Sequence, residues 1–351
     1  MVTCVGGRLI YDILRGLRSA SDFEAYIIGI DADPDAHGRL LCDEFYTVPM
    51  AEDDPEDYLA HLISIFEHTT YTILIPLSEA ETRIVAKNKQ QFLSFGITPS
   101  VSDHDTVECL TDKLTMLQVV HNAGLTGSDH CPIDAREDFN DAVQALGYPD
   151  RSVVVKPRRG RGSRGVLIVD DTKKEFQKLL PNRFCGTGDL DSVLGAAAIE
   201  DENFNNYIAV PYYDGPVYDL DCIAKSGKSV DLVARLRQLR NPLWPTSTGH
   251  RVNQNKQVLN LAYELCQLFK IDGAADFDII LADTGPHVID AGARFSGSVG
   301  GSITAGANFP AQLVRVLAGL SYKPLAPRDG VVIRPFLTMA EIPQSNEHDY
   351  L

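Results

Sequence analysis

Apolar residues in the first hundred positions alternate between the compact runs of buried strands and the wider spacing of helices. A short apolar run at the start of the chain ends in Gly6 and Gly7, and residues 8–20 follow with helical spacing. Residues 25–33 form a second compact run. A strand, a glycine turn, a helix and a strand predict a βαβ unit with parallel strands. The alternation continues to residue 102, so we expect one α/β unit over this part of the chain.

A further strand predicted over residues 71–77 ends in the polar residues Ser78 and Glu79. Polar groups at the carboxyl ends of parallel strands commonly face a ligand crevice. A helix cap at Ser78 explains the pattern equally well, so both interpretations stay open. Only Gly6 and Gly7 follow the first strand, and the GxGxxG fingerprint of dinucleotide-binding proteins is missing. The sequence therefore argues against a dehydrogenase.

The pattern changes after residue 103. Asp105 is a candidate cap for a helix that continues through residues 112–124 and carries Lys113. Two β-branched apolar runs, residues 153–157 and 165–169, then predict the strands of a hairpin. The next stretch, residues 171–184, has the composition of a surface helix.

The loop of this hairpin consists almost entirely of glycines and cations. Lys156 lies at its root, before Pro157. The loop arginines are Arg158, Arg159, Arg161 and Arg164, and the small residues among them are Gly160, Gly162, Ser163 and Gly165. Backbone N–H groups and guanidinium groups together suit a polyphosphate. A basic solvent-exposed hairpin is the alternative, and the phosphate-loop motif GxxxxGK[ST] is absent.

Strand-like alternation returns in the last third of the chain. It covers residues 207–225 and 230–240, and the period of two places Arg235 and Arg237 on one face. Residues 257–269 follow as an amphipathic helix.

A second hairpin, predicted from residue 273 with its turn at residues 283–285, carries several carboxylates. Asp276 and Asp278 share a face of its first strand, and we expect Asp276 to lie across from Asp290 on the second. Adjacent carboxylates repel unless a cation lies between them, and hard oxygen ligands suit Mg²⁺ that bridges phosphates. One carboxylate that caps a turn is the alternative. Arg294 is placed to hold a substrate carboxylate or a phosphoryl charge.

Composition limits the classes of function. The 351 residues are enough for two or three domains. With 48 acidic and 32 basic side chains the net charge is −16, which argues against nucleic acid or an acidic membrane as partner. Seven scattered cysteines without a CxxC pair suit the reducing cytoplasm. Nowhere do 18 apolar residues follow one another, so we expect no membrane span.

Five segments together resemble the ATP-grasp superfamily, and in particular carboxylate–amine ligases related to the carbamoyl-phosphate synthase large chain. These segments are IDADPDAHGRLLCDEFYTVP, TDKLTMLQVVHNAGL, VVVKPRRGRGSRGV, AVPYYDGPVYDLD and DFDIILADTGPHVIDAGARFSGS. The resemblance covers about residues 1–325 and implies an α/β, ATP-grasp fold. The implied parts are a Rossmann-like N-terminal domain (1–104), a small α+β lid domain with the phosphate hairpin (105–212), a C-terminal α+β domain for nucleotide and metal (213–330) and a tail (331–351).

The resemblance also implies roles for individual residues. ATP would be bound by Lys113, Lys156, Gly160, Gly162, Ser163, Val210 and Tyr212. The metal ligands would be Asp276 and Asp290. The substrate would be held by Arg294, Ser296, Gly297 and Ser298, and the catalytic cations would be Arg294, Lys156, Arg235 and Arg237.

Three departures from the family pattern stand out. Asp290 occupies the position of a glutamate, and Gly292 occupies that of an asparagine. In the adenine linker the acidic positions are Pro211 and Val217, which leaves the ribose contact unassigned.

The resemblance implies an ATP-dependent ligase with ATP and Mg²⁺ as cofactors. A substrate carboxylate would be converted to an acylphosphate with release of ADP, and an amine would then displace phosphate. The expected substrates are a small carboxylate and an amine, with amino acids among the candidates. A homodimer is the usual prior for such enzymes. The alternative is a catalytically degenerate ATP-binding protein with a regulatory or partner role.

Overall fold

The structure is a computed structural model of the chain. It describes residues 1–7, 10–68, 71–125, 129–160, 162–180, 183–200, 206–237 and 249–335. Arg161 of the basic loop, residues 238–240 of a predicted strand and most of the expected tail lie outside the described residues. Within them, no helix has both the length and the apolar character needed to cross a membrane.

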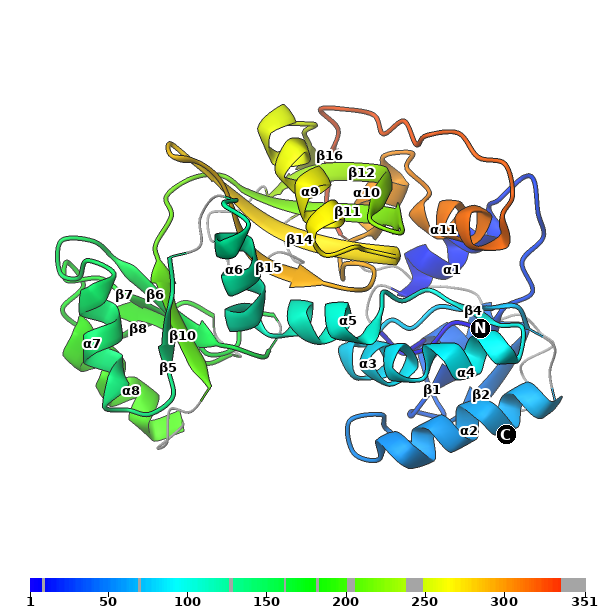
Figure 1. The fold of residues 1–351 in the computed structure, drawn as a ribbon, viewed down its shortest axis with the longest axis horizontal. Helices are drawn as coiled ribbons and strands as arrows, with labels where there is room; N and C mark the ends of the chain where they lie inside the picture. The colour runs from blue at the N-terminus through cyan, green and yellow to red at the C-terminus, as the bar shows by residue number, and fades with distance from the viewer. Residues whose placement is uncertain are drawn as a thin grey trace.

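Three groups of elements follow one another along the molecule (Figure 1). One end holds the N-terminal strands β1–β4 with their helices, and the other end holds a six-stranded sheet covered by α7 and α8. A second six-stranded sheet, covered by α9, lies between them, and α5 and α6 run along its lower side.

The N-terminal group consists of short parallel pairs, as the sequence predicts. Strand β1 pairs with β2, and β3 pairs with β4, both in parallel, while Val2 bridges Gly29 and Ile75. The elements are α1 (Ile10–Arg18), β1 (Ile28–Asp31), η1 (His37–Leu41), β2 (Glu44–Thr47), α2 (Pro55–His68), β3 (Ile73–Leu74), α3 (Glu79–Lys87), α4 (Lys89–Ser94) and β4 (Thr98–Pro99). The predicted βαβ arrangement is therefore confirmed.

Two short helices lead out of the N-terminal group. These are α5 (His104–Thr111) and α6 (Lys113–Asn122), and Asp103 rather than Asp105 is the N-cap residue of α5. The chain breaks its helical course at Asp112, whose carboxylate accepts hydrogen bonds from Leu114 N and Thr115 N. Lys113 therefore starts a new helix that is capped by its own neighbour.

The first six-stranded sheet contains the basic hairpin. Its order is β5-β10-β6-β7-β9-β8, and β6 pairs antiparallel with β7, which confirms the hairpin. The elements are β5 (Cys131–Ile133), α7 (Asp138–Ala145), β6 (Val153–Pro157), β7 (Val166–Val169), β8 (Gln177–Lys178), β9 (Cys185–Gly188), α8 (Leu190–Glu200) and β10 (Tyr207–Pro211). The helix predicted over 171–184 is wrong, because β8 pairs with β9 there and Phe176 and Phe184 pack against the core of this sheet.

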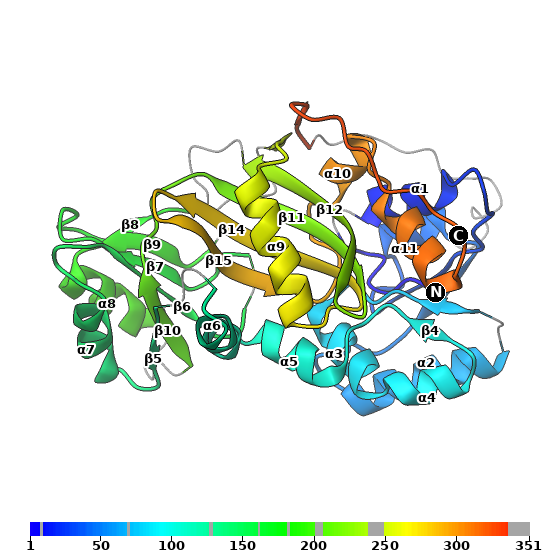
Figure 2. The same ribbon diagram turned by 45° about the horizontal axis from the view of Figure 1, so that its top comes forward.

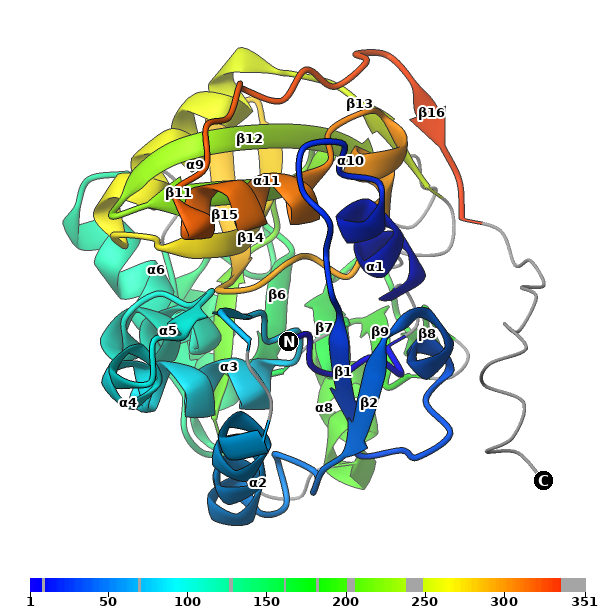
Figure 3. The same cartoon turned by 90° about the vertical axis from the view of Figure 1, so that its right-hand side faces the viewer.

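The second six-stranded sheet has the order β15-β14-β11-β12-β13-β16. Its elements and the helices around it are β11 (Val217–Lys225), β12 (Lys228–Arg237), β13 (His250–Val252), α9 (Lys256–Leu268), β14 (Gly273–Ala282), β15 (Gly285–Gly292), α10 (Gly300–Thr304), α11 (Phe309–Ala318) and β16 (Val332–Ile333). Helix α9 lies across one face of this sheet (Figure 2). Helices α1, α10 and α11 gather at one end of it (Figure 3).

The two faces of this sheet differ sharply in chemistry. Leu220, Cys222 and Phe277 alternate toward α9 and pack in the core with it. The intervening positions carry charged side chains on the opposite face, because successive residues of a strand point to opposite sides. That charged face is the floor of the candidate site.

Candidate active site

Five aspartates and two arginines meet on the charged face through the strand register. Strand β11 places Asp219 opposite Asp278 and Asp221 opposite Asp276 on β14. Strand β12 places Arg235 opposite Asp219, and Arg237 follows two residues later on the same face. Strand β15 adds Asp290 opposite Asp278. Residues that are far apart in the sequence therefore line one surface.

The expected pairing of Asp276 with Asp290 is wrong. Asp290 lies opposite Asp278, and Asp276 lies opposite Gly292. The turn contains only residues 283 and 284, and the register then shifts at a β-bulge that leaves Ile289 without a partner residue on β14. Both effects move β15 relative to β14, and a pattern of apolar positions alone does not reveal a bulge.

Gly292 is required by the position of Asp276. A Cβ atom at residue 292 would overlap Oδ1 of Asp276. The carboxylate of Asp276 therefore occupies the space in which a side chain of residue 292 would begin. The neighbouring strand thus places a carboxylate oxygen directly beside Gly292.

Two lysines approach this floor, Lys113 from α6 and Lys156 from β6 of the basic hairpin. Lys113 Nζ forms an ion pair with Asp290 Oδ1 at 3.1 Å and donates to the Gly160 carbonyl at 2.9 Å. Lys156 Nζ donates to the Ile289 carbonyl at 2.6 Å. This carbonyl belongs to the bulged residue, so the bulge provides the docking point for the hairpin. Both lysines are buried, as a polyphosphate site requires.

Burial and charge shift several pKa values at the floor. Burial lowers the pKa of Lys156 to about 8, against the opposing effect of Asp290. Burial raises the pKa of Asp276 to about 6, although Arg294 acts in the opposite direction. Burial and the neighbouring carboxylates also raise the pKa of Asp278 well above its usual range. Burial disfavours the charged forms of these carboxyl groups, so a cation bound beside Asp276, Asp278 and Asp290 would stabilise their ionised forms.

The three predicted arginines occupy different environments. Arg237 bridges two carboxylates, with Nε 2.6 Å from Asp219 Oδ1 and Nη2 2.6 Å from Asp278 Oδ2. Arg294 Nη1 lies 3.3 Å from both oxygens of Asp276. Both arginines line the pocket described below.

Arg235 is fully buried and lines neither the nucleotide-shaped pocket nor the acceptor pocket described below. Its Nε lies 2.9 Å from Asp221 Oδ2, and its Nη1 donates to the carbonyl and hydroxyl of Ser298 at 2.7 and 2.9 Å. Ser296 also bonds to this pair, with Oγ 2.6 Å from Asp221 Oδ1. The geometry makes Arg235 a positioning residue beneath the loop of residues 296–298.

A nucleotide-shaped pocket of about 430 Å³ lies between the two large sheets. Its apolar end is formed by Val154, Val166, Ile168, Leu179, Val210, Val217, Ile280 and Ile289, and its polar end by Lys113, Lys156, Arg237, Asp278 and Asp290. Gly160, Gly162, Ser163 and Tyr212 also line it, so all seven residues predicted to bind ATP border one cavity. An apolar cavity with cations at one end suits a nucleoside polyphosphate, because the base can contact the apolar residues and the phosphates the cations.

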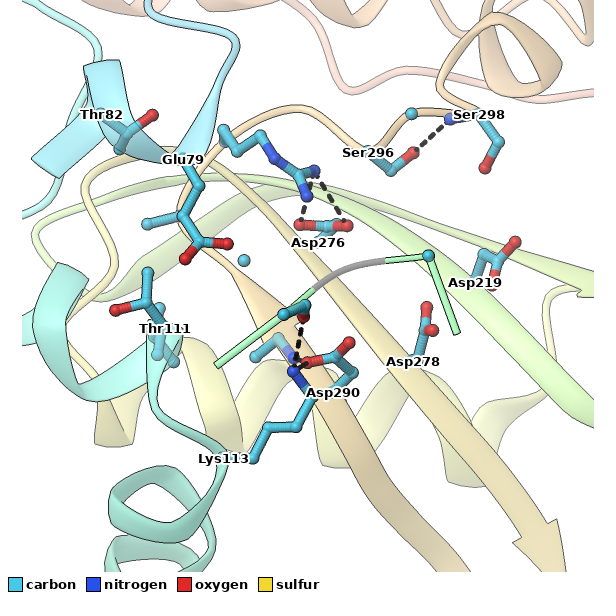
Figure 4. A pocket seen from close by; sticks show the side chains of 18 of the residues that line it. Glu79, Thr82, Thr111, Lys113, Asp219, Asp276, Asp278, Asp290, Ser296 and Ser298 are labelled. Atoms are coloured by element: carbon cyan, nitrogen blue, oxygen red, sulfur yellow. Dashed lines mark hydrogen bonds and ion pairs between the residues drawn. The ribbon is translucent and has the colours of Figure 1, made fainter. Parts of the chain in front are cut away.

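An acceptor pocket of about 200 Å³ adjoins the polar end of this cavity. Lys113, Gly160, Arg237, Asp278 and Asp290 border both cavities. Ser296, Gly297 and Ser298 line the acceptor pocket, together with Arg294 and Asp276. Figure 4 shows the carboxylate of Glu79 pointing toward Asp276 and Asp290, and Thr82 and Thr111 also line this pocket. The acceptor pocket has room for one small molecule only.

The hairpin loop is fastened to α5 and α6 through its arginines. Arg158 forms two hydrogen bonds to Asp112, at 3.1 and 2.6 Å. Arg159 donates to Glu108 at 3.3 Å, and Glu108 also binds Arg83 of α3. The backbone of Gly160 and Gly162 has positive φ, which glycine adopts without strain. These contacts hold the loop over the junction of the two cavities.

Several residues that line the two cavities are not predicted from the sequence. Leu179 lies where a helix was predicted, and Thr111 and Thr82 are unremarkable in a helix pattern. Ser78 caps α3 through a capping box with Glu81, and its neighbour Glu79 faces the acceptor pocket, so both interpretations of this pair hold. Asp219 and Asp278 could have been found from the period of two along their strands.

No group of three carboxylate, histidine or cysteine side chains in the described ranges is arranged to hold a metal ion alone. Asp278 and Asp290, which face each other, are hard oxygen donors where the two cavities meet, and Asp276 adds a third in the acceptor pocket. Mg²⁺ usually takes one or two carboxylates and completes its shell with water and substrate phosphates. The residues present fit such a shared site.

Comparison with known proteins agrees with this geometry. Residues 203–339 match the family model "ATP-grasp in the biosynthetic pathway with Ter operon", and residues 1–100 match the model "PylC-like, N-terminal domain". Comparison with curated proteins gives no match.

Solved structures resemble the chain over nearly its whole length. N5-carboxyaminoimidazole synthetase from Staphylococcus aureus, complexed with ADP, has a TM-score of 0.70 at 15% identity, over 93% of this chain and 79% of that one. The L-amino acid ligase from Bacillus licheniformis has a TM-score of 0.65 at 14% identity, over 90% and 73%. The biotin carboxylase β,γ-ATP complex from Campylobacter jejuni has a TM-score of 0.65 at 16% identity, over 92% and 71%.

These likenesses define the class of fold, and each of the two family models covers less than half of the chain. The fold of the chain is the α/β ATP-grasp fold, and the resemblance expected from the sequence is confirmed. Within this class, the C-terminal region matches the model for ATP-grasp proteins encoded with Ter operons, and the N-terminal region matches a PylC-like domain.

Proposed function

We propose that the chain is an ATP-dependent carboxylate–amine ligase that uses Mg²⁺. The observation that supports this most is the junction of two cavities, one shaped for a nucleotide and one for a small acceptor, over a floor of carboxylates and cations. The likeness to a synthetase, an amino acid ligase and a carboxylase, two of them solved with ADP or an ATP analogue, supports the same class.

Asp278 and Asp290 would hold Mg²⁺, with Asp276 beside them. Mg²⁺ would neutralise phosphate charge and orient the β- and γ-phosphates. Lys113 and Lys156 would bind phosphate oxygens at the polar end of the nucleotide-shaped cavity. Because Asp276 places a carboxylate oxygen directly beside Gly292, the departure from the family pattern does not imply a degenerate site.

The acceptor pocket would hold the carboxylate substrate. Arg294 and Arg237 border this pocket and would orient the carboxylate toward the γ-phosphate. The carboxylate oxygen would attack phosphorus and give an acylphosphate and ADP. An amine would then attack the acyl carbon, and phosphate would leave with the electron pair of the broken C–O bond. The fastened hairpin loop would keep water away from the acylphosphate.

The test separates the two half-reactions. The protein is incubated with Mg·ATP, hydroxylamine and one small carboxylic or amino acid at a time, and ADP and hydroxamate are measured. Hydroxylamine traps an acylphosphate without the natural amine. Amines are then added in place of hydroxylamine, and a product lighter by one water than the sum of both substrates establishes ligation. Tight Mg·ATP binding with no ADP and no hydroxamate from any acid would refute the proposal.

A further inference from the structure

A third cleft, of about 550 Å³, adjoins the acceptor pocket and also meets the nucleotide-shaped pocket, because Pro157, Gly160 and Arg164 border both this cleft and that pocket. It lies between α3 and the basic hairpin, and it is bordered by Glu52, Glu79, Ala80, Arg83, Pro157, Arg159, Gly160, Arg164, Gly165, Phe184 and Tyr207. Glu79 and Gly160 border both this cleft and the acceptor pocket. A molecule in the cleft would therefore reach the acceptor pocket past Glu79.

The carboxylate of Glu79 is available at this point. Within the described ranges, no hydrogen bond or ion pair engages it, and Figure 4 shows it pointing into the acceptor pocket. The capping box of α3 is formed by Ser78 and Glu81 and does not involve Glu79. Arg83, one turn along α3, is held by Glu108, with Nε 2.5 Å from Oε1. Arg83 therefore donates to Glu108, and the charges of Arg83 and Arg294 act on Glu79 without a direct contact.

Charge is distributed unequally along the cleft. The carboxylate of Glu79 lies at its inner end, where it meets the acceptor pocket. Arg83 and Arg164 border the cleft, and in the described part of the chain no hydrogen bond or ion pair engages Arg164. Glu79 and Arg83 are four residues apart on α3, so they lie on the same helix face about one turn from each other.

We propose that this cleft binds the amine substrate, with its ammonium group at Glu79 and an anionic group of the same molecule at Arg83 and Arg164. The chemical class is a primary amine that carries a carboxylate or a phosphate a few bonds from the nitrogen. This inference rests on the proposed function, because it assigns the second substrate of that reaction. Glu79 is a binding residue of the amine and does not line the nucleotide-shaped pocket, whereas Arg164 borders both the cleft and that pocket.

The experiment uses the carboxylate identified by hydroxamate formation and compares matched amines. We expect 4-aminobutanoate or 2-aminoethyl phosphate to exceed 1-aminobutane at least tenfold in kcat/KM. The carboxylate and phosphate probes distinguish the two sources of anionic charge. In Arg83→Gln the ratio of kcat/KM between the anionic amines and 1-aminobutane should fall close to one. The thermal midpoint of this variant shows whether the fold is kept.

Glu79→Gln should reduce amide formation at least thirtyfold more than it reduces hydroxamate formation, mainly through the KM of the amine. Hydroxylamine is largely uncharged at neutral pH, so it does not need a carboxylate partner. Glu264→Gln removes a carboxylate from the exposed side of α9, outside the three cavities, and it should leave both reactions as they are.

Each other outcome is decisive. Equal losses of amide and hydroxamate in Glu79→Gln would assign Glu79 to the carboxylate substrate and overturn the inference, and so would no loss at all. A preference for 1-aminobutane would remove the anion site at Arg83 and Arg164. Absence of hydroxamate with the unaltered protein would refute the proposed function itself, which is a different result from a failure of amine selectivity.

Discussion

Replacement of Gly292 by alanine tests the arrangement of the metal-binding floor directly. The added Cβ would overlap Oδ1 of Asp276. Asp276 has little room to retreat, because both of its oxygens lie 3.3 Å from Arg294 Nη1 and its strand runs between β11 and β15. We expect the carboxylate to rotate away and lose its partner.

The size of the effect follows from this geometry. Forcing one extra carbon into a packed site typically costs ~1–3 kcal/mol. The side chain of Asp276 is 19% exposed, so the ion pair with Arg294 lies between the surface and core cases. We therefore expect Gly292→Ala to lower the free energy of unfolding by about 2 kcal/mol. A ligand oxygen displaced by on the order of 1 Å should reduce the rate of ADP release by roughly 100-fold.

A double-mutant cycle provides the assay. Gly292→Ala, Asp276→Ala and the double variant are compared by urea unfolding and by initial rates of ADP release at several Mg²⁺ concentrations. Without the Asp276 carboxylate the alanine should cost less than about 0.5 kcal/mol, since the clash is gone. An equal cost in both backgrounds would show that Asp276 does not fill the space beside Gly292. An unaltered Mg²⁺ requirement in Asp276→Ala would remove Asp276 from the metal site.

The family pattern suggests a rescue. Gly292→Asn combined with Asp276→Gly returns the oxygen to β15 and removes the carboxylate that occupies its space. This double variant should recover at least tenfold in ADP release over Asp276→Gly alone, with Asp276→Gly/Gly292→Ala as the matched control that adds bulk without an oxygen.

Three further predictions concern the cations. Lys156→Ala should lower ADP release at least 100-fold while the far-ultraviolet circular dichroism and thermal midpoint remain, and an unaltered rate would remove Lys156 from the site. Because burial lowers the pKa of Lys156 to about 8, its charge is lost as the pH rises through 8, so kcat/KM for ATP should fall above that pH. In Lys156→Arg the side chain stays charged, so this fall in kcat/KM should vanish. A fall that persists in Lys156→Arg would show that another group causes it. Arg235→Ala should lower the free energy of unfolding by ~3–5 kcal/mol, because it leaves Asp221 buried without its partner, and urea unfolding that shows less than about 1 kcal/mol would contradict this.

The sequence predicts the elements of this fold better than their relative placement. The basic hairpin, the β12 strand and the α9 helix follow from local periodicity, which depends on residues near one another in the chain. The helix expected over 171–184 is wrong because a short edge strand there pairs with β9, a contact that local composition does not encode.

The candidate site shows the same division. The motif residues Lys113, Lys156 and Asp290 do come together, and the structure places them at one end of a single cavity. The sequence predicts Asp276 as the cross-strand partner of Asp290, but the partner is Asp278, two residues further on. A two-residue turn and a bulge at Ile289 both change the register. The burial of Arg235 could not be predicted from the sequence either, because it depends on contacts with Ser296 and Ser298, some sixty residues away in the chain.

The contacts of Lys113 and Lys156 bear on selectivity among phosphorylated molecules. Both ammonium groups already have partners within the protein. Lys113 contacts Asp290 and the Gly160 carbonyl, and Lys156 contacts the Ile289 carbonyl. An incoming anion must replace these contacts as it forms its own. A single phosphate replaces few of them at once, whereas a polyphosphate that spans both lysines replaces all of them together. These internal contacts of the two lysines therefore favour a polyphosphate over inorganic phosphate and nucleoside monophosphates.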